Sequence, residues 1–463
     1  MPEKNTDMTS TKTFHVLTFG CQMNVHDSEW LARALTVRGW TEVSEDEAEV
    51  YIVNTCSVRD KPEQKVYSLL GRLRAYIAEH PDRFVAVGGC VAQQIGNDFL
   101  ERYPFVRLVF GTDQVGRVPH ALDELLEDGE RRMALLDFED GYPSQDAVDP
   151  ESAAVTHLPG QAFVNIMKGC DNFCAYCIVP FVRGRQRSRR ADDIVRECEV
   201  LVESGVREIT LLGQNVNSFG LDKQGDGTSF AELLERVAAI DGLTRLRFTT
   251  SHPKDLAPEV IDAFGRLDAL CPSLHLPMQC GSDNILKAMG RKYDMERYMG
   301  LVRGLKEVRP DIALTTDLIV GFPGETDEDF RQTLAAVEEV GFESSFSFIY
   351  SDRPGTRAEK MPFKIDRKVQ GERLIELQTL QETLTRAALK RCEGTEAEVL
   401  VESRSKVQDG DDVISWRGRD RYGRVVNFPW PQAAGDLAGK LVRVRIEIAK
   451  KHSLSGKVVG ELW

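Results

Sequence analysis

The sequence predicts an α/β protein in three parts: an N-terminal parallel sheet covered by helices, a central partial barrel of six βα units, and a small C-terminal all-β barrel. Three observations carry this prediction. Short apolar runs alternate with helix-like segments from Phe14 to Val109. A second series of the same kind follows after residue 160. Residues 394–463 instead alternate apolar and polar side chains at strand spacing.

Length and composition indicate a large, soluble chain. The 463 residues suggest about three domains. No run of about 18 apolar residues occurs, and the stretch from Met1 to Lys12 is polar, so we expect neither a transmembrane helix nor a signal peptide. The net charge of −14 argues against indiscriminate nucleic-acid binding. We therefore expect a cytoplasmic protein without membrane association and, because no heptad seam or repeat is visible, a monomer.

The first domain is expected over residues 12–130, with strands in "FHVLTFG", "VYIVNTC", "FVAVGGC" and "VRLVFGT". Cys21, Cys56 and Cys90 each follow such a strand and are 35 and 34 residues apart. The carboxyl ends of parallel strands share one edge of a sheet, so three cysteines there can converge. A metal site is favoured, although free cysteines are also common in cores.

The second domain is expected over residues 156–390, after an acidic, irregular linker at 131–155. Its candidate strands are "AFVNIMK", "REITLLG", "TRLRFTT", "SLHLP", "IALTTDLIVG" and "ESSFSFIY". Helical segments separate most of them, which predicts a partial barrel with its chemistry at the carboxyl ends of the strands.

The third domain is expected over residues 391–463, as a five-stranded barrel of the OB type with a basic margin. Such barrels bind RNA through a groove and stacking aromatic side chains. Either stacking on bases or packing in the barrel core is open for the aromatic residues Trp416, Tyr422, Phe428 and Trp430.

The stretch "KGCDNFCAYCIVP" places Cys170, Cys174 and Cys177 at Cys-x3-Cys-x2-Cys spacing, directly after the first strand of the predicted barrel. Soft thiolates at close spacing select zinc or an iron-sulfur cluster. Structural zinc normally takes four ligands, and no adjacent histidine or fourth cysteine is present. A 4Fe-4S cluster held by three cysteines leaves one iron open to bind a small molecule.

This triplet resembles that of the radical S-adenosylmethionine enzymes, and Tyr176 matches the aromatic residue that usually precedes their third cysteine. The resemblance implies a 4Fe-4S cluster on Cys170, Cys174 and Cys177. It also implies that the open iron binds S-adenosylmethionine, which an electron from the cluster cleaves to methionine and a 5′-deoxyadenosyl radical.

Further motifs resemble the methylthiotransferases, most closely the MiaB-type tRNA branch, over nearly the whole chain: "TFGCQMNVHDSE", "VNTCSVRDKPEQK", "VGGCVAQQ", "LLGQNVNS", "RFTTSHP" and "DLIVGFPGETDEDF". The resemblance implies a second 4Fe-4S cluster on Cys21, Cys56 and Cys90. It implies methylthiolation at C2 of N6-isopentenyl-adenosine at position 37 of tRNA, with two molecules of S-adenosylmethionine. The C-terminal barrel resembles the TRAM domain, an RNA-binding module, through "KKHSLSGKVV".

The same resemblance implies contacts to S-adenosylmethionine at Gly213, Gln214 and Asn215, which end the second strand. From their position at the active face of the predicted barrel, further candidates for cofactor contact are Ser251, His252, Asp317 and Ile319, and His252 is also a candidate for substrate contact. Each also has a structural interpretation: a turn at Gly213–Asn215, a hydrogen-bonding wall residue at His252, a buried structural carboxylate at Asp317, and strand core at Ile319.

An arginine-rich stretch follows the triplet, and we expect it to contact tRNA phosphates unless it is merely a solvated loop. Its residues are Arg183, Arg185, Arg187, Arg189 and Arg190. The expected partners are the anticodon stem-loop of tRNA, an electron donor such as flavodoxin or ferredoxin, and an iron-sulfur carrier protein.

Two residues depart from the family pattern: Gln186 stands where the tRNA branch often has Glu, and Cys280 where Ser is more usual.

Two other functions stay open. Related methylthiotransferases modify a ribosomal-protein aspartate or a threonylcarbamoylated tRNA adenosine. A non-catalytic RNA-binding protein with structural zinc is the second alternative. Cys198, Cys271 and Cys392 are assigned to core packing.

Overall fold

The computed structural model describes residues 12–57, 60–142, 159–223, 225–405, 413–431 and 435–462. The chain forms two compact units. The first comprises the residues up to Val155 together with Val179–Gly184, and the second comprises Thr156–Ile178 and everything from Arg185 onward. Within the described ranges no helix has the length and apolar character to span a bilayer.

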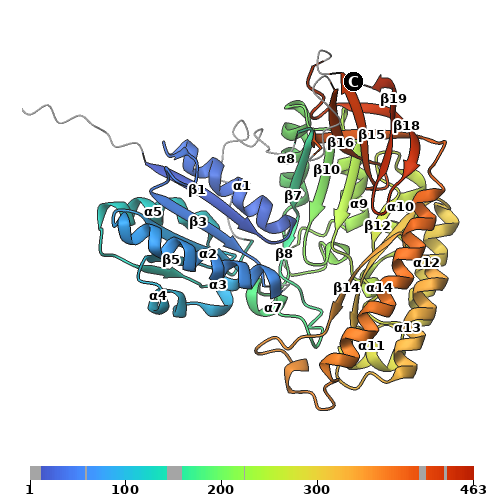
Figure 1. Cartoon of the computed structure of the whole chain (residues 1–463), viewed down its shortest axis with the longest axis horizontal. Helices are drawn as coiled ribbons and strands as arrows, with labels where there is room; N and C mark the ends of the chain where they lie inside the picture. The colour runs from blue at the N-terminus through green and yellow to red at the C-terminus, as the bar shows by residue number, and fades with distance from the viewer. Residues whose placement is uncertain are drawn as a thin grey trace, which may run out of the picture. The chain divides into compact units, whose positions relative to one another are not determined.

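The first unit is built on a six-stranded sheet in which every neighbouring pair is parallel (Figure 1). This confirms the predicted parallel sheet. The strand order is β2-β1-β3-β4-β5-β6. The strands are β1 (Thr13–Phe19), β2 (Thr41–Glu42), β3 (Val50–Thr55), β4 (Phe84–Gly89), β5 (Val106–Phe110) and β6 (Met133–Leu135).

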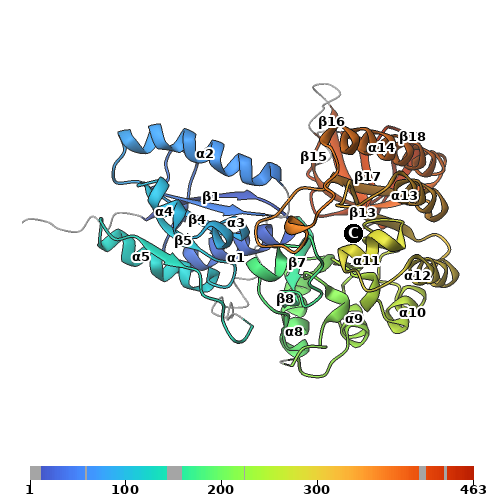
Figure 2. The same ribbon diagram turned by 90° about the horizontal axis from the view of Figure 1, so that it is seen from below.

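Helices cover both faces of this sheet (Figure 2). On one face Ile52 packs with α1 (Gln22–Val37) and α5 (Val118–Glu127). On the other face Tyr51 and Val53 pack with α2, α3 and α4. Successive side chains of a strand point to opposite faces of the sheet, so neighbouring residues of β3 belong to different cores. The helices of the second face are α2 (Asp60–Glu79), α3 (Cys90–Ile95) and α4 (Asp98–Arg102), and the short helices η1 (Val115–Arg117) and α7 (Val179–Val182) complete the unit.

The segment expected to be a linker begins as part of the sheet. Residues 133–135 form β6, which pairs with β5 through Leu108↔Met133 and Phe110↔Leu135. Met133 and Leu135 also pack against the core beside α1 and α5. An acidic composition around these residues concealed a three-residue strand whose stability comes from its neighbour. Residues 143–155 of the expected linker lie outside the described residues.

The second unit contains the partial barrel, and all six predicted strands are present. Two parallel three-stranded sheets, β7-β10-β11 and β12-β13-β14, adjoin at a parallel bridge between Leu246 and Leu270. The strands are β7 (Gln161–Asn165), β10 (Glu208–Leu212), β11 (Arg245–Thr249), β12 (Ser273–His275), β13 (Ala313–Val320) and β14 (Ser344–Ile349).

Helices between and after these strands bury the outer face of the partial barrel in one apolar core. They are α8 (Ala191–Glu203), α9 (Phe230–Ala238), α10 (Pro258–Arg266), α11 (Asp283–Met289), α12 (Met295–Val308), α13 (Asp327–Val340) and α14 (Arg367–Lys390). Shorter elements lie in the loops: β8 (Met167–Lys168), β9 (Arg187–Ser188), η2 (Val216–Ser218), η3 (Pro253–Asp255) and η4 (Ala358–Lys360).

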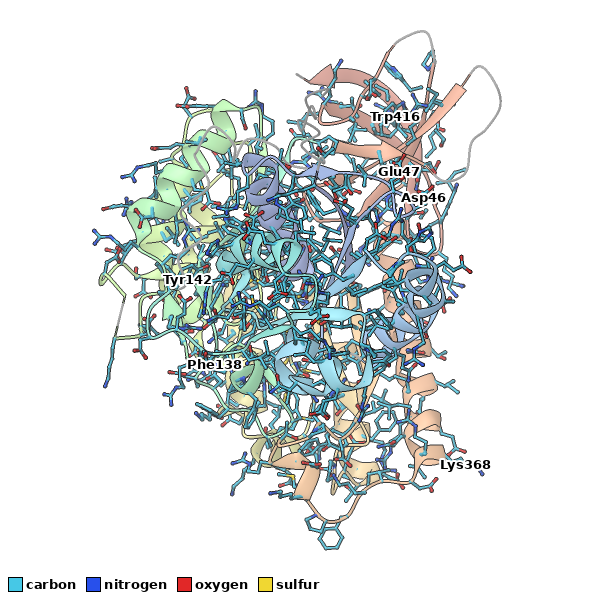
Figure 3. All side chains as sticks on the ribbon, turned by 90° about the vertical axis from the view of Figure 1, so that its left-hand side faces the viewer. Asp46, Glu47, Phe138, Tyr142, Lys368 and Trp416 are labelled. Atoms are coloured by element: carbon cyan, nitrogen blue, oxygen red, sulfur yellow. The ribbon has the colours of Figure 1, made fainter. Side chains whose placement is uncertain are left out.

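The C-terminal strands form a closed five-stranded barrel in the order β15-β16-β17-β19-β18, as the sequence predicts. It docks at the amino-terminal ends of the partial-barrel strands, where Arg245, the first residue of β11, binds Glu398 at 3.1 Å. Figure 3 shows Trp416 among the strands of this barrel and Lys368 at the amino-terminal end of α14, the end far from the barrel. The strands are β15 (Glu396–Arg404), β16 (Val413–Asp420), β17 (Val425–Pro431), β18 (Leu441–Ala449) and β19 (Leu454–Leu462).

Candidate iron-sulfur and S-adenosylmethionine sites

The first candidate site is the strand-end set, Cys21, Cys56 and Cys90. Phe19, Thr55 and Gly89 lie side by side at the ends of β1, β3 and β4 in the register of the sheet. Cys56 and Cys90 directly follow the last two, and Cys21 comes two residues after Phe19. The sheet therefore brings the three cysteines together at its carboxyl edge.

Two glycines show how closely the three strand ends approach. A Cβ on Gly20 would lie 2.4 Å from Asn24 Oδ1 and 2.7 Å from Cys56 Cβ. Gly89 has φ +88°, and a Cβ there would lie 2.3 Å from the Thr55 carbonyl oxygen. Any larger residue at either position would push the cysteine loops apart.

A pair of buried amides holds the strand-end set. The Asn24 side chain donates to Asn54 Oδ1 at 2.9 Å and to the Thr55 carbonyl at 3.0 Å. Asn54 in turn donates to the Asn24 carbonyl at 3.0 Å. The Cys21 thiol donates to Asn24 Oδ1 at 3.3 Å. The sequence signal for Asn24 was available, since "CQMN" places a polar residue three positions after the N-terminal residue of a helix.

A buried guanidinium completes this site. Arg183, from the short segment that belongs to the first unit, lies 3.6 Å from Asp27 and interacts electrostatically with Cys90 and Cys21. Only 4% of Arg183 is exposed. The sequence assigned this arginine to RNA phosphates, but a side chain enclosed by thiols and a carboxylate does not present its charge to solvent.

The thiols of this set differ in acidity. A hydrogen bond with the Cys56 side chain, opposed by burial and aided by the positive charge of Arg183, lowers the pKa of Cys21 to about 6. Burial raises the pKa of Cys90, and Arg183 opposes that rise. The guanidinium therefore favours the thiolate form, which is the form that binds a metal.

The second candidate site is the loop triplet, Cys170, Cys174 and Cys177, which follows β7 and β8. Backbone hydrogen bonds hold it: Ala175 donates to the Met289 carbonyl at 2.7 Å and accepts from Ala358 at 2.8 Å. Burial raises the pKa of Cys170 to about 11. The thiols of the triplet are half-buried, so they are enclosed by protein yet reachable from the barrel mouth.

Residues at the end of β10, predicted to contact S-adenosylmethionine, also help to hold the triplet loop. Gln214 accepts a hydrogen bond from the backbone N–H of Gly169 at 2.5 Å. Asn215 and Asn172 both donate to Asp255, at 2.7 and 3.1 Å. Their contact with the cofactor stays a prediction.

Gly213, beside Gln214, has no space for a side chain. A Cβ there would lie 2.6 Å from Met167 Cγ. Asp255 was not predicted from the sequence, because no motif around it indicates a role. Together these contacts fix the triplet loop to the carboxyl end of the barrel.

Ser251 and His252 lie at the carboxyl end of β11, both buried. His252 Nε2 is 3.8 Å from Cys174 Sγ, so this residue does face the triplet. Burial, reinforced by the charges of Arg291 and Lys254, lowers the pKa of His252 to about 2. The imidazole is therefore neutral at physiological pH.

Asp317 and Ile319 share one face of β13 and are half-buried, while the alternate residues Leu318 and Val320 are fully buried against the helices. Asp317 Oδ2 lies 3.4 Å from His275 Nε2. Both predicted cofactor contacts thus belong to the inner face of the partial barrel, and their role stays a prediction.

The arginine-rich stretch divides into buried and exposed members. Arg187 is only 4% exposed, and Arg189 binds the Asn165 carbonyl and Glu197, each at 2.7 Å. Arg185 is exposed and binds Asp171 at 2.7 Å, and Arg190 is exposed at the start of α8. Burial therefore corrects the prediction of a five-arginine RNA surface, because Arg183 and Arg187 are enclosed by protein.

The aromatic candidates of the C-terminal barrel also divide. Trp416 and Phe428 are each 1% exposed and form its core, which excludes them as stacking platforms. Tyr422 donates to Asp311 of the partial barrel at 2.5 Å. Trp430 is half-buried against the barrel core. Cys198, Cys271 and Cys392 are buried, as expected.

The two departures from the family pattern have local explanations. Gln186 donates to the Ser218 carbonyl at 2.5 Å and accepts from the Ser218 hydroxyl at 2.7 Å, a pairing that needs an amide. Cys280 is fully buried with its sulfur 3.3 Å from Thr333 Oγ1. Neither residue belongs to the two cysteine sets.

The donor sets fit clusters better than single ions. Among the described residues, no three His, Cys, Asp or Glu side chains are placed to hold one metal ion. In an iron-sulfur cluster each cysteine binds a different iron. Three soft sulfur donors per site, without carboxylate or imidazole ligands among them, match that chemistry.

A cavity of about 650 Å³ lies between the partial barrel and the C-terminal barrel. It is lined by residues such as Asp311, Glu343 and Arg424, and none of the six predicted cluster ligands lines it. Because barrels of this type carry their chemistry at the opposite, carboxyl ends of the strands, we place the site by the cysteines.

Comparison with known proteins adds three family models. Residues 13–111 match an uncharacterized protein family, UPF0004, residues 164–337 match the radical SAM superfamily, and residues 390–459 match the TRAM domain. Their order along the chain is that of the three predicted domains.

Relatives match the chain from end to end. A tRNA-2-methylthio-N(6)-dimethylallyladenosine synthase of Nitratidesulfovibrio vulgaris (strain DP4) is 59% identical over 98% of this chain and 99% of its own length. Proteins of the same name from Oleidesulfovibrio alaskensis and Lawsonia intracellularis are 56% and 50% identical, over 97% and 96% of this chain and 99% and 98% of their own lengths. The chain belongs to this synthase family.

Solved structures agree with the fold of this family member. The radical S-adenosylmethionine methyltransferase TsrM from Kitasatospora setae, with cobalamin and a 4Fe-4S cluster bound, gives a TM-score of 0.53 at 16% identity, over 75% of this chain and 77% of that chain. The same enzyme with tryptophan and a cofactor analogue bound gives 0.52, over 87% and 79%. At this identity the likeness supports the fold alone.

Proposed function

We propose that this chain adds a methylthio group to C2 of N6-isopentenyl-adenosine at position 37 of tRNA, as a radical S-adenosylmethionine enzyme. The observation that carries the proposal is the pair of cysteine sets, each gathered on its own scaffold, in a chain whose end-to-end relatives bear the name of this synthase. An aromatic C–H bond has neither an acidic proton nor a leaving group, which excludes ordinary acid-base chemistry at neutral pH.

The chain's own residues hold and orient the cofactors. Cys170, Cys174 and Cys177 would hold one 4Fe-4S cluster, and the strand-end set would hold the second. When bound, the clusters and S-adenosylmethionine supply the radical and the sulfur chemistry. Gln214 and Asp255 keep the triplet loop on the barrel end. Ser251, Asp317 and Ile319 are the proposed contacts to S-adenosylmethionine.

The RNA surface that we propose is smaller than the sequence suggested. Arg185 and Arg190 are the exposed members of the arginine-rich stretch that follows the triplet. The TRAM-like barrel adds a second RNA-binding surface, and the target adenosine, already single-stranded in an anticodon loop, is splayed out at modest cost. An electron donor such as flavodoxin or ferredoxin, an iron-sulfur carrier, a cytoplasmic location and a monomeric state complete the proposal.

The test is one anaerobic incubation of reconstituted protein with S-adenosylmethionine, a reductant and tRNA carrying isopentenyl-adenosine. Mass spectrometry should find both 5′-deoxyadenosine and the methylthiolated nucleoside. Deoxyadenosine without the modified nucleoside would redirect the search to a ribosomal-protein aspartate or a threonylcarbamoylated adenosine. If neither product forms although both clusters are intact, the proposal is wrong. A colourless, zinc-rich protein would favour the non-catalytic alternative.

A further inference from the structure

Two buried side chains converge on one thiol of the loop triplet. Arg291 Nη1 lies 3.6 Å from Cys174 Sγ, and His252 Nε2 lies 3.8 Å from the same sulfur. Arg291 is 4% exposed and His252 is 5% exposed. They come from different parts of the barrel, the loop after β11 and the turn after α11, so their convergence is a property of the tertiary structure.

Arg291 is held rigidly in this position. Its Nη2 donates to the Pro277 carbonyl at 2.8 Å, and its Nε donates to the Tyr293 hydroxyl at 3.2 Å. Tyr293 is fixed in turn by the Met278 carbonyl, which accepts from its hydroxyl at 2.8 Å. The guanidinium therefore presents Nη1 toward Cys174 Sγ and the Tyr176 hydroxyl, the latter 3.5 Å away.

The charge of Arg291 needs a negative partner. An arginine stays protonated even when buried, and a buried cation without a compensating charge is costly. Within the described part of the chain, no carboxylate forms an ion pair with Arg291. Among the groups in contact with Arg291, Cys174 is a predicted cluster ligand, and a cysteine binds iron as a thiolate, which would supply that charge.

The hydrogen bond from His252 has a defined direction. The backbone N–H of Lys254 donates to His252 Nδ1 at 3.2 Å, so Nδ1 carries the lone pair. In a neutral imidazole the proton then lies on Nε2, which points at Cys174 Sγ. Cys174 thus receives one charged and one neutral donor, whereas Cys170 receives a backbone hydrogen bond from Asn172.

We propose that Arg291 and His252 are positioning residues that raise the reduction potential of the cluster held by the loop triplet. This rests on the proposed function, namely that the triplet binds a 4Fe-4S cluster. A fixed positive charge and hydrogen bonds to a cysteine sulfur stabilise the reduced form, because that form carries one more negative charge. The two residues therefore make electron uptake, the step that precedes cleavage of S-adenosylmethionine, more favourable.

The experiment is a redox titration of the reconstituted full-length holoenzyme, followed by electron paramagnetic resonance with and without S-adenosylmethionine. The signal that changes on addition of S-adenosylmethionine reports the triplet cluster. Arg291→Met should load normal amounts of iron and sulfide, yet shift the potential of that signal to more negative values. Arg291→Lys, which keeps the charge on a shorter reach, should shift it less.

The matched control is Arg424→Met, which removes a partly buried guanidinium, bound to Glu343 at 2.5 Å and away from both cysteine sets. It should leave the potential unchanged. Full loading of Arg291→Met with an unchanged potential would overturn the proposal. If Arg291→Met does not load its cluster, the reduction potentials of Arg291→Lys and His252→Gln are measured in its place. Unchanged potentials in both of these variants would overturn the proposal. A wild-type protein without any S-adenosylmethionine-responsive signal would instead contradict the proposed function itself.

Discussion

The strand-end set and the loop triplet gather the same ligands by different means. Cys21, Cys56 and Cys90 are 35 and 34 residues apart and meet because parallel strands end at one edge. Cys170, Cys174 and Cys177 lie within one loop of eight residues. A folded sheet must therefore exist before the first set can assemble, whereas the second set is close together in any conformation of its loop.

The largest contrast is expected from removing one cysteine of each set. Cys177→Ala should abolish 5′-deoxyadenosine formation, because the triplet would lose a ligand. Cys56→Ala should retain it but abolish the methylthiolated nucleoside, because only the second cluster is lost. Mass spectrometry of both products checks this. Cys198→Ala, in the core, should retain both products at a stability cost of about 1 kcal/mol. Equal loss of both products in the two variants would show that the sites do not act separately.

A single glycine tests how tightly the strand ends are packed. Gly20→Ala would place a Cβ 2.4 Å from Asn24 Oδ1 and 2.7 Å from Cys56 Cβ, so the strand-end set should not load. Iron analysis after reconstitution should give roughly half the wild-type content, since one of two 4Fe-4S clusters is missing. Gly71→Ala, with no atom within 4 Å of the added Cβ, is the matched control and should load fully.

Substitution of Arg183 tests whether this arginine stabilises the fold or binds RNA. Arg183→Met removes the guanidinium that faces the buried Asp27 and should destabilise the first unit by about 3–5 kcal/mol. Urea unfolding, followed by the near-ultraviolet signal, measures this loss. Asp27→Asn in the same chain should recover part of it, because the uncompensated charge is removed. A loss of tRNA affinity without any loss of stability would return Arg183 to the RNA surface.

Substitution of the exposed arginines should weaken RNA binding and leave the fold unchanged. The double variant Arg185→Glu, Arg190→Glu should weaken tRNA binding, and the slope of log Kd against log salt should fall by about 1.5–2. Filter binding at several salt concentrations measures the slope. Arg196→Glu, on α8 and equally exposed, is the control expected to leave it unchanged. Unchanged affinity of the double variant at moderate salt would exclude this loop from the interface.

The smallest effect concerns Gln186. Glutamate in its place would turn a donor toward the Ser218 carbonyl into an acceptor and add a charge near Asp222, 3.5 Å from the present amide. We expect Gln186→Glu to lower the free energy of unfolding by about 1–3 kcal/mol without loss of either cluster. Denaturant midpoints measure it, and equal or greater stability would show that the amide pairing is not required.

Periodicity predicted the fold well because it reports burial directly. All six partial-barrel strands and the strands of the N-terminal sheet that carry the cysteines were visible as apolar runs. The exceptions were two short edge strands, β2 (Thr41–Glu42), which pairs with β1, and β6 (Met133–Leu135), which lies in an acidic stretch and is stabilised by pairing with β5. Short edge strands carry too little local signal to be recognised without their neighbour.

The residues around the cysteines were predicted less well. Arg183 and Arg187 belong to a run that by composition is a basic surface, yet both are buried. Arg291, Asp255 and Asn54 were not identified at all. Their importance depends on which thiol, amide or loop each one meets, and those partners lie between 30 and 117 residues away.

What the sequence determined by itself is what depends on local spacing: the strand and helix periods, the Cys-x3-Cys-x2-Cys triplet, and the position of a cysteine after each of three strands. Only the tertiary structure decided which charges face those thiols. Burial and hydrogen bonding depend on distances between segments far apart in the chain, and the same arginine is a phosphate contact on a surface and a thiolate partner in a core.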